Sequence, residues 1–320
     1  MNVLKFPKGK PYSHGRKSVV RGLLHWVTSL MEYLLNVTVS IAFDGLAFAM
    51  ILFIISVGLS VTMGLMGFVN LAHGAFAMVG VYISVSLMRS YDVPFLLSIV
   101  ISFVLVALIS VPFERLLYAR FYGADELDQV LLTIGLVFMA VALCTFIWGP
   151  LNVQLDVPSY LKGQVDLGFR KFPTYRMFII AVSGVIIVAL WYGLERTLIG
   201  AQIRAAVDNR RMAQSVGINV NRLFTLTFAL GSGLGAVGGA LGTEILGLTP
   251  TYALEYLVYF LIVVGVGGLG SIRGAFVASL ILGVVDTAGK YLLPEFGAFF
   301  IFALTIILLL WKPAGLFGRA

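Results

Sequence analysis

The sequence has 320 residues, of which 60% are hydrophobic and only 12% are charged, and its formal net charge is +7. So few charged residues exclude a soluble globular domain of this length, and apolar stretches of about 20 residues, the length that a bilayer core requires of a helix, recur along the whole chain. The single cysteine, Cys144, excludes an internal disulfide and a cysteine-based metal site, and the three histidines are too scattered for a paired-histidine metal motif.

The first 30 residues are basic and precede any sustained apolar run. They contain no short hydrophobic core followed by a small-residue cleavage site, so we expect no cleaved signal peptide. We interpret residues 1–30 as a basic cytoplasmic tail held against anionic lipid. Residues 31–320 are expected to form a single transmembrane domain, because no polar stretch is long enough to fold as a second, soluble domain.

Nine apolar segments are expected to form helices. In chain order they are 41–63, 72–89, 95–113, 129–148, 174–194, 223–247, 255–269, 274–290 and 297–311. Segment 18–40 is more polar, because it contains Arg21, His25 and Glu32, and it is either an interfacial helix or an additional span. The sequence therefore predicts an all-α fold, a polytopic transmembrane helical bundle of roughly eight to ten spans.

Arginine is concentrated in the loop 195–222, which contains five arginines. Because positively charged loops stay in the cytoplasm, this loop, residues 114–128 and the C-terminus are placed inside, and the loop 149–172 is placed outside. Nine spans would put the two termini on opposite sides of the membrane. A cytoplasmic tail therefore requires either a tenth span in 18–40 or a re-entrant segment near 64–90.

Glycines recur at a spacing of four in the segment "ALGSGLGAVGGALG", residues 229–242. Gly231, Gly235 and Gly239 would share one helix face, where small residues let two helix backbones approach closely in lipid. Close packing inside one subunit explains this face better than a dedicated dimer motif does.

Two glycine-rich motifs resemble nucleotide-binding loops but lack the required context. The segment "GVGGLG" (265–270) joins two apolar spans, whereas a dinucleotide fingerprint follows a strand in a soluble unit. In "GVVDTAGKY" (283–291) five residues separate Gly283 from Gly289-Lys290 where a phosphate-binding loop has about four, and Tyr291 replaces Ser or Thr. We therefore expect this chain to bind no nucleotide, cofactor or metal itself, and we find no catalytic grouping of serine, histidine and acid.

The segment "ERTLIGAQIRAAVDNRRMAQSVGINVNRLF", residues 195–224, is too polar to span a membrane but has helical periodicity. Its apolar residues near helical spacing are Leu198, Ile199, Ile203, Ala206 and Val207. Arg204 with Asp208, and Asp208 with Arg211, have spacings at which ion pairs form on a helix, and Gly217 followed by Ile218 is typical of a helix C-cap. We expect a short amphipathic cytoplasmic helix, which either tiles the membrane surface or docks a cytoplasmic partner.

Four segments resemble the branched-chain amino acid permeases of ABC importers (the LivH group). The coupling segment and following span of that family are similar to residues 195–243, and its characteristic segment after the first long span resembles "MGFVNLAHGAFAMVGVYIS". Its late glycine turn resembles "VVGVGGLGSIRGAFVASLILGVVD", and its C-terminal ending resembles "WKPAGLFGR". The similarity runs from about residue 40 to the end, in the family's order. Arg273 stands where the family often has proline, and the basic tail is an unrecognised extension.

The resemblance implies a multi-pass protein of the bacterial inner membrane that acts as a transport channel and not as an enzyme. A homologous second permease subunit would complete the channel, two cytoplasmic ATPase subunits would bind ATP, and a periplasmic substrate-binding protein would deliver the substrate. The coupling residues that it implies for contact with the ATPases are Gly200, Arg204, Ala205, Asp208 and Gly217. Branched-chain amino acids are the default substrate, with urea, short amides or aromatic acids as alternatives.

The segment "GLMGFVNLAHGAFAMVG", residues 64–80, places glycines and polar side chains inside an apolar run. Backbone at membrane depth leaves helical form only where protein or a water-filled cavity surrounds it. Our hypothesis is that the chain breaks at glycines 64, 67 and 74, and that Gly67, Asn70, His73 and Gly74 form a hinge near the translocation path. The alternative is that Asn70 and His73 only cap helix ends and hold spans together.

Other polar residues are expected near the ends of the spans, where interfacial placement explains them: Asp44, Thr243, Glu244, Glu255, Asp286 and Lys290. We expect Thr243 and Glu244 to be close enough to the outside to contact the binding protein. Two other classes of protein were considered. An ion-coupled secondary transporter would suit broken helices but not the coupling-like helix, and a membrane-embedded enzyme lacks a catalytic set.

Overall fold

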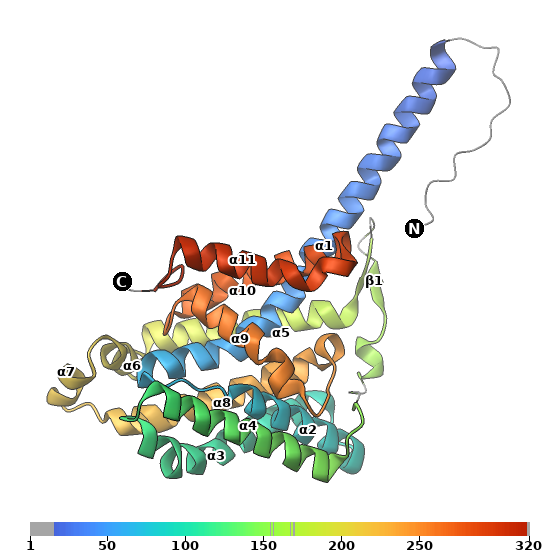
Figure 1. The fold of residues 1–320 in the computed structure, drawn as a ribbon. Coiled ribbons are helices and arrows are strands. Elements are labelled where there is room, and N and C mark those ends of the chain that lie inside the picture. The colour runs from blue at the N-terminus through green and yellow to red at the C-terminus, as the bar shows by residue number, and fades with distance from the viewer. Residues whose placement is uncertain (1–15, 154, 156, 167, 169, 319–320) are drawn as a thin grey trace.

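The computed structural model describes residues 16–153, 155, 157–166, 168 and 170–318. Half of the predicted basic tail, residues 1–15, lies outside the described residues, and the cytoplasmic position of the tail stays a prediction. The described chain is almost entirely helical, as Figure 1 shows.

The helices are α1 (Arg16–Met66), α2 (His73–Tyr91), α3 (Phe95–Leu116), α4 (Glu126–Trp148), α5 (Thr174–Arg196), α6 (Leu198–Asp208), α7 (Arg210–Ser215), α8 (Val220–Leu246), α9 (Tyr252–Gly267), α10 (Ile272–Leu292) and α11 (Gly297–Trp311). Short 3₁₀ turns lie at Tyr118–Phe121, Ser159–Leu161 and Pro294–Phe296. Among the described residues, six helices are long and apolar enough to cross a membrane, and α9 and α11 are shorter apolar helices. The predicted all-α membrane bundle is confirmed.

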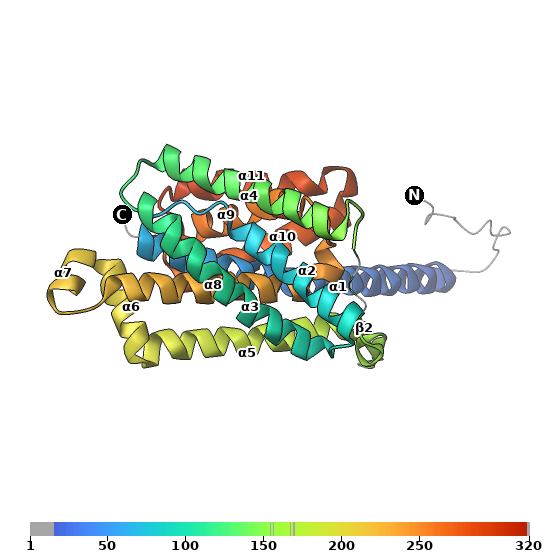
Figure 2. The ribbon, with the colours of Figure 1, turned by 90° about the horizontal axis from the view of Figure 1, so that it is seen from below.

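The second half of α1 forms the centre of the bundle. Residues 47–60 are all buried, and α8, α10, α5 and α9 pack around them (Figures 1 and 2). Apart from Ser56 and Ser60 this stretch has no polar side chain, which is typical of a helix that is enclosed by protein. Gly58 within it lets α8 approach closely.

The first half of α1 extends the same helix beyond the bundle, at the end opposite α6 and α7 (Figure 1). A helix of 51 residues is about 77 Å long at ~1.5 Å per residue, against ~30 Å for a bilayer core. Segment 18–40 is therefore neither a separate interfacial helix nor a separate span in this structure. The reason is that no proline or glycine interrupts the chain between the polar segment and the first apolar span.

The predicted outer loop between α4 and α5 contains an antiparallel hairpin of β1 (Gln164–Asp166) and β2 (Lys171–Pro173), in which Val165 pairs with Phe172. The hairpin contacts the long first helix, because Arg170 donates hydrogen bonds to the Asn36 carbonyl and to the Ser40 hydroxyl. The hairpin and the free end of α1 lie at the same end of the molecule (Figure 1).

The glycine-rich face of α8 packs inside the subunit, as predicted. A Cβ on Gly58 of α1 would lie 2.5 Å from the Gly231 carbonyl oxygen, and a Cβ on Gly239 would lie 2.8 Å from the Ala77 carbonyl oxygen of α2. Because Gly231, Gly235 and Gly239 are buried against α1 and α2, this face is not available to a partner.

A break separates α1 from α2, and α2 begins deep in the bundle. Residues 67–72 are not helical, and His73, the first residue of α2, lies beside Ile55, which is eleven residues (about 16 Å of helix) before the end of α1. The chain therefore turns back along α1 before it becomes helical again. From there α2 continues toward the end of the bundle opposite α6 (Figure 2), so a re-entrant segment near residues 64–90 and the number of spans stay predictions.

Candidate coupling and translocation sites

The connection between α5 and α8 contains the short helices α6 and α7, which project from one end of the bundle (Figure 1). Thr197 begins α6, because its hydroxyl accepts a hydrogen bond from the Gly200 N–H at 3.1 Å. Asn209 begins α7 in the same way, accepting from the Met212 N–H at 3.0 Å, and Asn219 begins α8. Thr and Asn are favoured at these positions because they satisfy free N–H groups of a first turn.

The structure divides the expected coupling helix in two. Asn209 has an extended backbone (φ −154°) between α6 and α7, so Asp208 and Arg211 lie on different helices and the spacing rule for one helix does not apply to them. The predicted C-cap at Gly217 is confirmed at the end of α7. Gly217 has φ +86°, and the Ile218 N–H donates to the carbonyl five residues earlier at 3.1 Å, which is the Schellman pattern.

The inner face of α6 is fixed by close packing. Gly200, Ile203 and Ala206 are buried, and a Cβ on Gly200 would lie 2.3 Å from the Leu194 carbonyl oxygen. Gly200 is therefore required where α6 turns against the end of α5. The helix pair is also tied to α8, because the Arg210 guanidinium lies 4.7 Å from the centre of the Phe224 ring.

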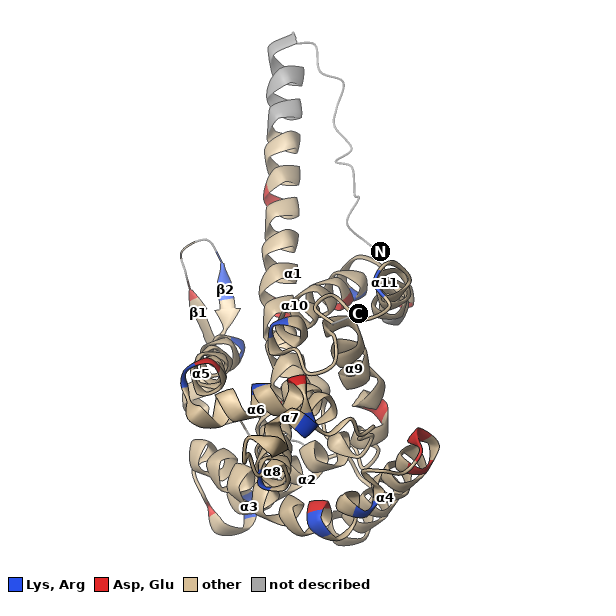
Figure 3. Ribbon diagram, turned by 90° about the vertical axis from the view of Figure 1, so that its left-hand side faces the viewer, with Lys and Arg blue, Asp and Glu red and all other residues tan. Residues whose placement is uncertain are grey.

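The outer face of this pair is apolar and exposed. Leu198 is 84% exposed and Val216 is 71% exposed, and Ile199 and Met212 are exposed beside them. Figure 3, which looks onto this end, shows basic residues around the same helices. Exposed apolar side chains among arginines, on a projection held by three caps, suit a protein partner better than water.

Arg204, Ala205 and Asp208 are exposed on α6, and Arg204 and Asp208 border a cavity of about 900 Å³. Its walls are the end of α5, the end of α1 and the turn between α9 and α10, where Arg273 forms an ion pair with Glu195 at 2.9 Å. Gly67 also lines this cavity. The structure thus brings Gly67, Arg204 and Asp208 to one cavity, whereas Asn70, His73 and Gly74 do not line it.

The break between α1 and α2 is satisfied by side chains from within the bundle. Gly67 has φ +59°, a conformation that favours glycine, and its N–H closes the last turn of α1. The Val69 N–H donates to the Gln129 Oε1 of α4 at 3.0 Å, and Gln129 in turn donates to the Ala124 carbonyl at 3.1 Å. Irregular backbone at this depth is therefore paired with protein and not with lipid.

Asn70 and His73 are both buried and both bind other elements. The Asn70 Oδ1 accepts from the Ala72 N–H at 3.1 Å and from the Tyr118 hydroxyl at 3.0 Å. The His73 Nε2 donates to the Ile55 carbonyl at 2.9 Å, which ties the start of α2 to the middle of α1. Both side chains thus hold elements of the bundle together, as the alternative expected, but neither caps α2, whose N-cap Ala72 has no side-chain cap, and their role as a hinge stays a hypothesis.

Two of the glycines that were expected to break the chain have another role. Gly64 is still helical in α1, and Gly74 is already helical in α2. A Cβ on Gly74 would lie 2.9 Å from the Ala253 carbonyl oxygen of α9, so this glycine permits close helix packing. Only Gly67 has the positive φ that an actual break requires.

A family model described as the branched-chain amino acid transport system permease component matches residues 41–309. The chain belongs to this family. The matched range begins just before the buried half of α1 and ends in α11, so it contains the break, the projecting helices and both ends of the bundle.

Relatives of known name cover nearly the same range. The branched-chain amino acid permease LivH of Escherichia coli K12 is 29% identical over 87% of this chain and 94% of its own length. BraD of Pseudomonas aeruginosa is 26% identical over 83% and 91%, and a probable LivH of Methanocaldococcus jannaschii is 25% identical over 84% and 89%. No solved structure matches the chain. These relatives are transport permeases and not enzymes.

The permease also has site residues that sequence reasoning missed. Gln129 and Tyr118 hydrogen-bond to the break between α1 and α2, at Val69 and Asn70, and neither stands in a recognisable motif. Beside them, Glu114 accepts hydrogen bonds from the Tyr122 hydroxyl and from the Thr225 hydroxyl, the latter at 2.8 Å, and so joins α3, α8 and the turn after α3. Burial is the larger cause, and the hydrogen bond to Glu114 a smaller cause, of a raised pKa at Tyr122. The phenol therefore keeps its proton and stays a donor.

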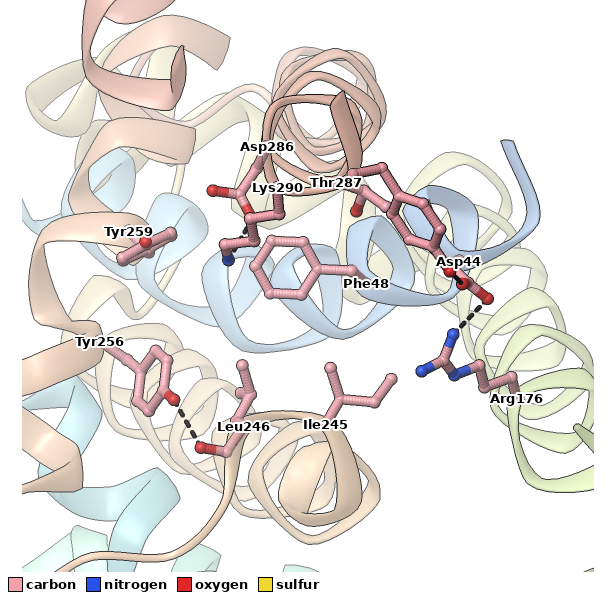
Figure 4. A pocket seen from close by; sticks show the side chains of 11 residues that line it. Asp44, Phe48, Arg176, Ile245, Leu246, Tyr256, Tyr259, Asp286, Thr287 and Lys290 are labelled. Atoms are coloured by element: carbon pink, nitrogen blue, oxygen red, sulfur yellow. Dashed lines mark hydrogen bonds and ion pairs between the residues drawn. The ribbon is translucent and has the colours of Figure 1, made fainter. Parts of the chain in front are cut away.

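A second cavity, the outer cavity, lies at the opposite end of the permease and has a volume of about 330 Å³ (Figure 4). Its polar lining comes from helices that are far apart in the sequence: α1 gives Asp44, α5 gives Arg176, and α10 gives Asp286 and Lys290. The sequence suggested interfacial placement for Asp286, but its side chain is only 1% exposed. Thr243, predicted to contact a partner, is buried, whereas Glu244 is exposed.

Proposed function

We propose that this chain is a transmembrane permease subunit of a binding-protein-dependent ABC importer in the inner membrane. Its substrate class is branched-chain amino acids. Two separate ATPase subunits supply the energy, a homologous second permease subunit completes the channel, and a periplasmic binding protein delivers the substrate. The family supports the transport role, and the names of the relatives support the substrate class.

The observation that carries the coupling role is the exposed apolar face of α6 and α7. Leu198 and Ile199 lie exposed on a helix whose other face is locked against α5 by Gly200. A groove on an ATPase would cover this face, and Arg204 and Asp208, further along α6, would fix the pitch of the helix through charged contacts. The cavity that they share with Gly67 provides a physical route from this contact to the break.

Residues 67–74 are proposed as the hinge that responds to ATPase movement. Gly67 at the cavity wall would move with α6, and Asn70 and His73 would transmit the motion to Tyr118 and to α1 through their hydrogen bonds. Alanine at both Asn70 and His73 tests this role. Loss of uptake from a stably assembled complex supports the hinge, and unchanged uptake would reject it.

Uptake measurements test the function itself. The gene is deleted and entry of radiolabelled leucine is followed, with excess valine, urea or benzoate as competitor, with and without ATP depletion. We expect saturable leucine uptake to be lost, to return with the wild type and not with Arg204→Glu, and to be blocked by valine only. Competition by urea or benzoate instead would reject the substrate class, and uptake that survives ATP loss but needs an ion gradient would reject the importer class.

A further inference from the structure

The outer cavity carries balanced charge at its two ends. Asp286 and Lys290 pair at 2.6 Å at one end, and Asp44 and Arg176 pair at the other end. Figure 4 shows the ring of Phe48 between the two pairs. Two carboxylates and two cations sum to zero, so the cavity as a whole favours neither an anion nor a cation. A dipolar ligand with an apolar part is complementary to such a lining.

The two pairs differ in how fully they are satisfied. The Asp44 carboxylate pairs with Arg176 and also accepts a hydrogen bond from the Tyr291 hydroxyl at 2.6 Å. A guanidinium and a phenol therefore both hold it in place. Asp286 is buried and receives Lys290 on Oδ2, but within the described part of the chain its Oδ1 has no hydrogen-bond partner. A buried carboxylate oxygen without a donor has unused capacity to bind a cation with N–H groups.

Lys290 is suited to exchange its partner. Its side chain is 52% exposed, and its ammonium group lies 5.3 Å from the centre of the Phe48 ring. Its own charge can therefore stay solvated when it leaves Asp286, whereas the buried Asp286 carboxylate then needs a replacement cation. The carboxylate and the ammonium group of this pair are as close as the two charged groups of an α-amino acid, so one zwitterion can bind both of them head to tail.

We propose that the outer cavity binds the zwitterionic head of an apolar amino acid. The ammonium group of the ligand binds Asp286, its carboxylate binds Lys290, and its side chain lies along Phe48, Ile245 and Leu246. The pair of Asp44 and Arg176 closes the far end. This proposal rests on the proposed import of amino acids and adds where, in the permease itself, the released substrate is first held. Urea has neither charged group and does not fit the same contacts.

Protection of one cysteine from a maleimide measures binding directly. The purified, assembled importer carries Cys144→Ala, which removes the single native cysteine, and Ile245→Cys, which places a thiol on the cavity wall. The labelling rate is measured with leucine, with leucinamide, with isocaproate and with urea, in the absence of the binding protein. We expect leucine to slow labelling at least threefold, and the other three, each of which lacks one or both charges, to have no effect.

Asp286→Asn and Lys290→Met are each expected to abolish protection by leucine, and Lys290→Met, at a half-exposed position, guards against a folding defect. Glu255→Gln is the matched control, because Glu255 accepts from Thr249 and Thr251 at the same end and does not line the cavity.

Absent protection in the unsubstituted cavity, equal protection by isocaproate or urea, or protection that persists in both variants would each overturn the proposal. If leucine uptake by cells still depends on this chain, such a result rejects the cavity site alone. Uptake that is indifferent to the chain rejects the proposed function instead.

Discussion

The α-carbon of Gly64 in α1 faces that of Gly270 in the turn before α10, so closely that a Cβ on Gly64 would lie 2.2 Å from it. The Gly270 N–H also donates to the Ser60 carbonyl at 3.1 Å. The turn between α9 and α10 is thereby fixed to the end of α1, directly before the break at Gly67. Both glycines line the cavity that Arg204 borders, so this contact forms one wall of the proposed coupling route.

Gly64→Ala is expected to destabilise the permease by about 1–3 kcal/mol, because backbone atoms that cannot move aside occupy the space of the new methyl group. The measurement is the melting temperature of the purified protein in detergent. Gly135→Ala in α4 is the control, since nothing lies within 4 Å of a Cβ at that position and alanine favours a helix. Equal melting temperatures for the two variants would contradict the close contact.

Leu198→Asp is expected to weaken binding of the ATPase subunits about tenfold or more, since Leu198 is an exposed apolar side chain on the proposed docking face. Co-purification of the ATPases with a tagged permease measures the effect. The fold should be unchanged, because Leu198 is 84% exposed. Tyr91→Asp, at a similarly exposed position near the opposite end, should leave ATPase binding intact, and a loss with both variants would show that the effect is not local.

Asn70 and Tyr118 are expected to be energetically coupled by about 1 kcal/mol, since the Tyr118 hydroxyl donates to the Asn70 Oδ1 at 3.0 Å in a buried setting. A double-mutant cycle with Asn70→Ala and Tyr118→Phe, followed by thermal unfolding, measures this coupling. Tyr192→Phe replaces an exposed hydroxyl of α5 and should add independently to Asn70→Ala. Additive effects of Asn70→Ala and Tyr118→Phe would show that the hydrogen bond contributes nothing.

Hydrophobic periodicity predicted the helices well because in lipid it is the dominant constraint on the chain. The segments 95–113, 129–148 and 174–194 differ from α3, α4 and α5 by only a few residues at each end. Local signals also succeeded where they act over one turn, as with the C-cap at Gly217. Hydrophobic periodicity did not predict that residues 18–40 continue into α1. That segment is polar, but it contains no residue that ends the helix before the first apolar span.

The polar sites were less predictable, since their partners come from distant segments. Gln129 is sixty residues from Val69, and Asp44 is 132 residues from Arg176, so no local pattern connects them. The segment 64–80 did indicate that the chain breaks, yet it could not show which glycine has positive φ. Gly64 and Gly74 remain helical, and each lies against the backbone of a distant segment that the sequence alone does not place beside it.

Gly67 offers the most direct test of the hinge. Nothing lies within 4 Å of a Cβ at this position, so a substitution there tests the backbone conformation, φ +59°, and not the packing of a side chain. Asparagine tolerates this conformation, whereas a β-branched residue is strained in it by roughly 1–2 kcal/mol. We therefore expect Gly67→Asn to keep most leucine uptake and Gly67→Val to lower it several-fold, while both variants still bind the ATPases. Uptake in proteoliposomes, normalised to the amount of assembled complex, measures the difference. Equal uptake by the two variants would show that the left-handed conformation at Gly67 is not needed during transport.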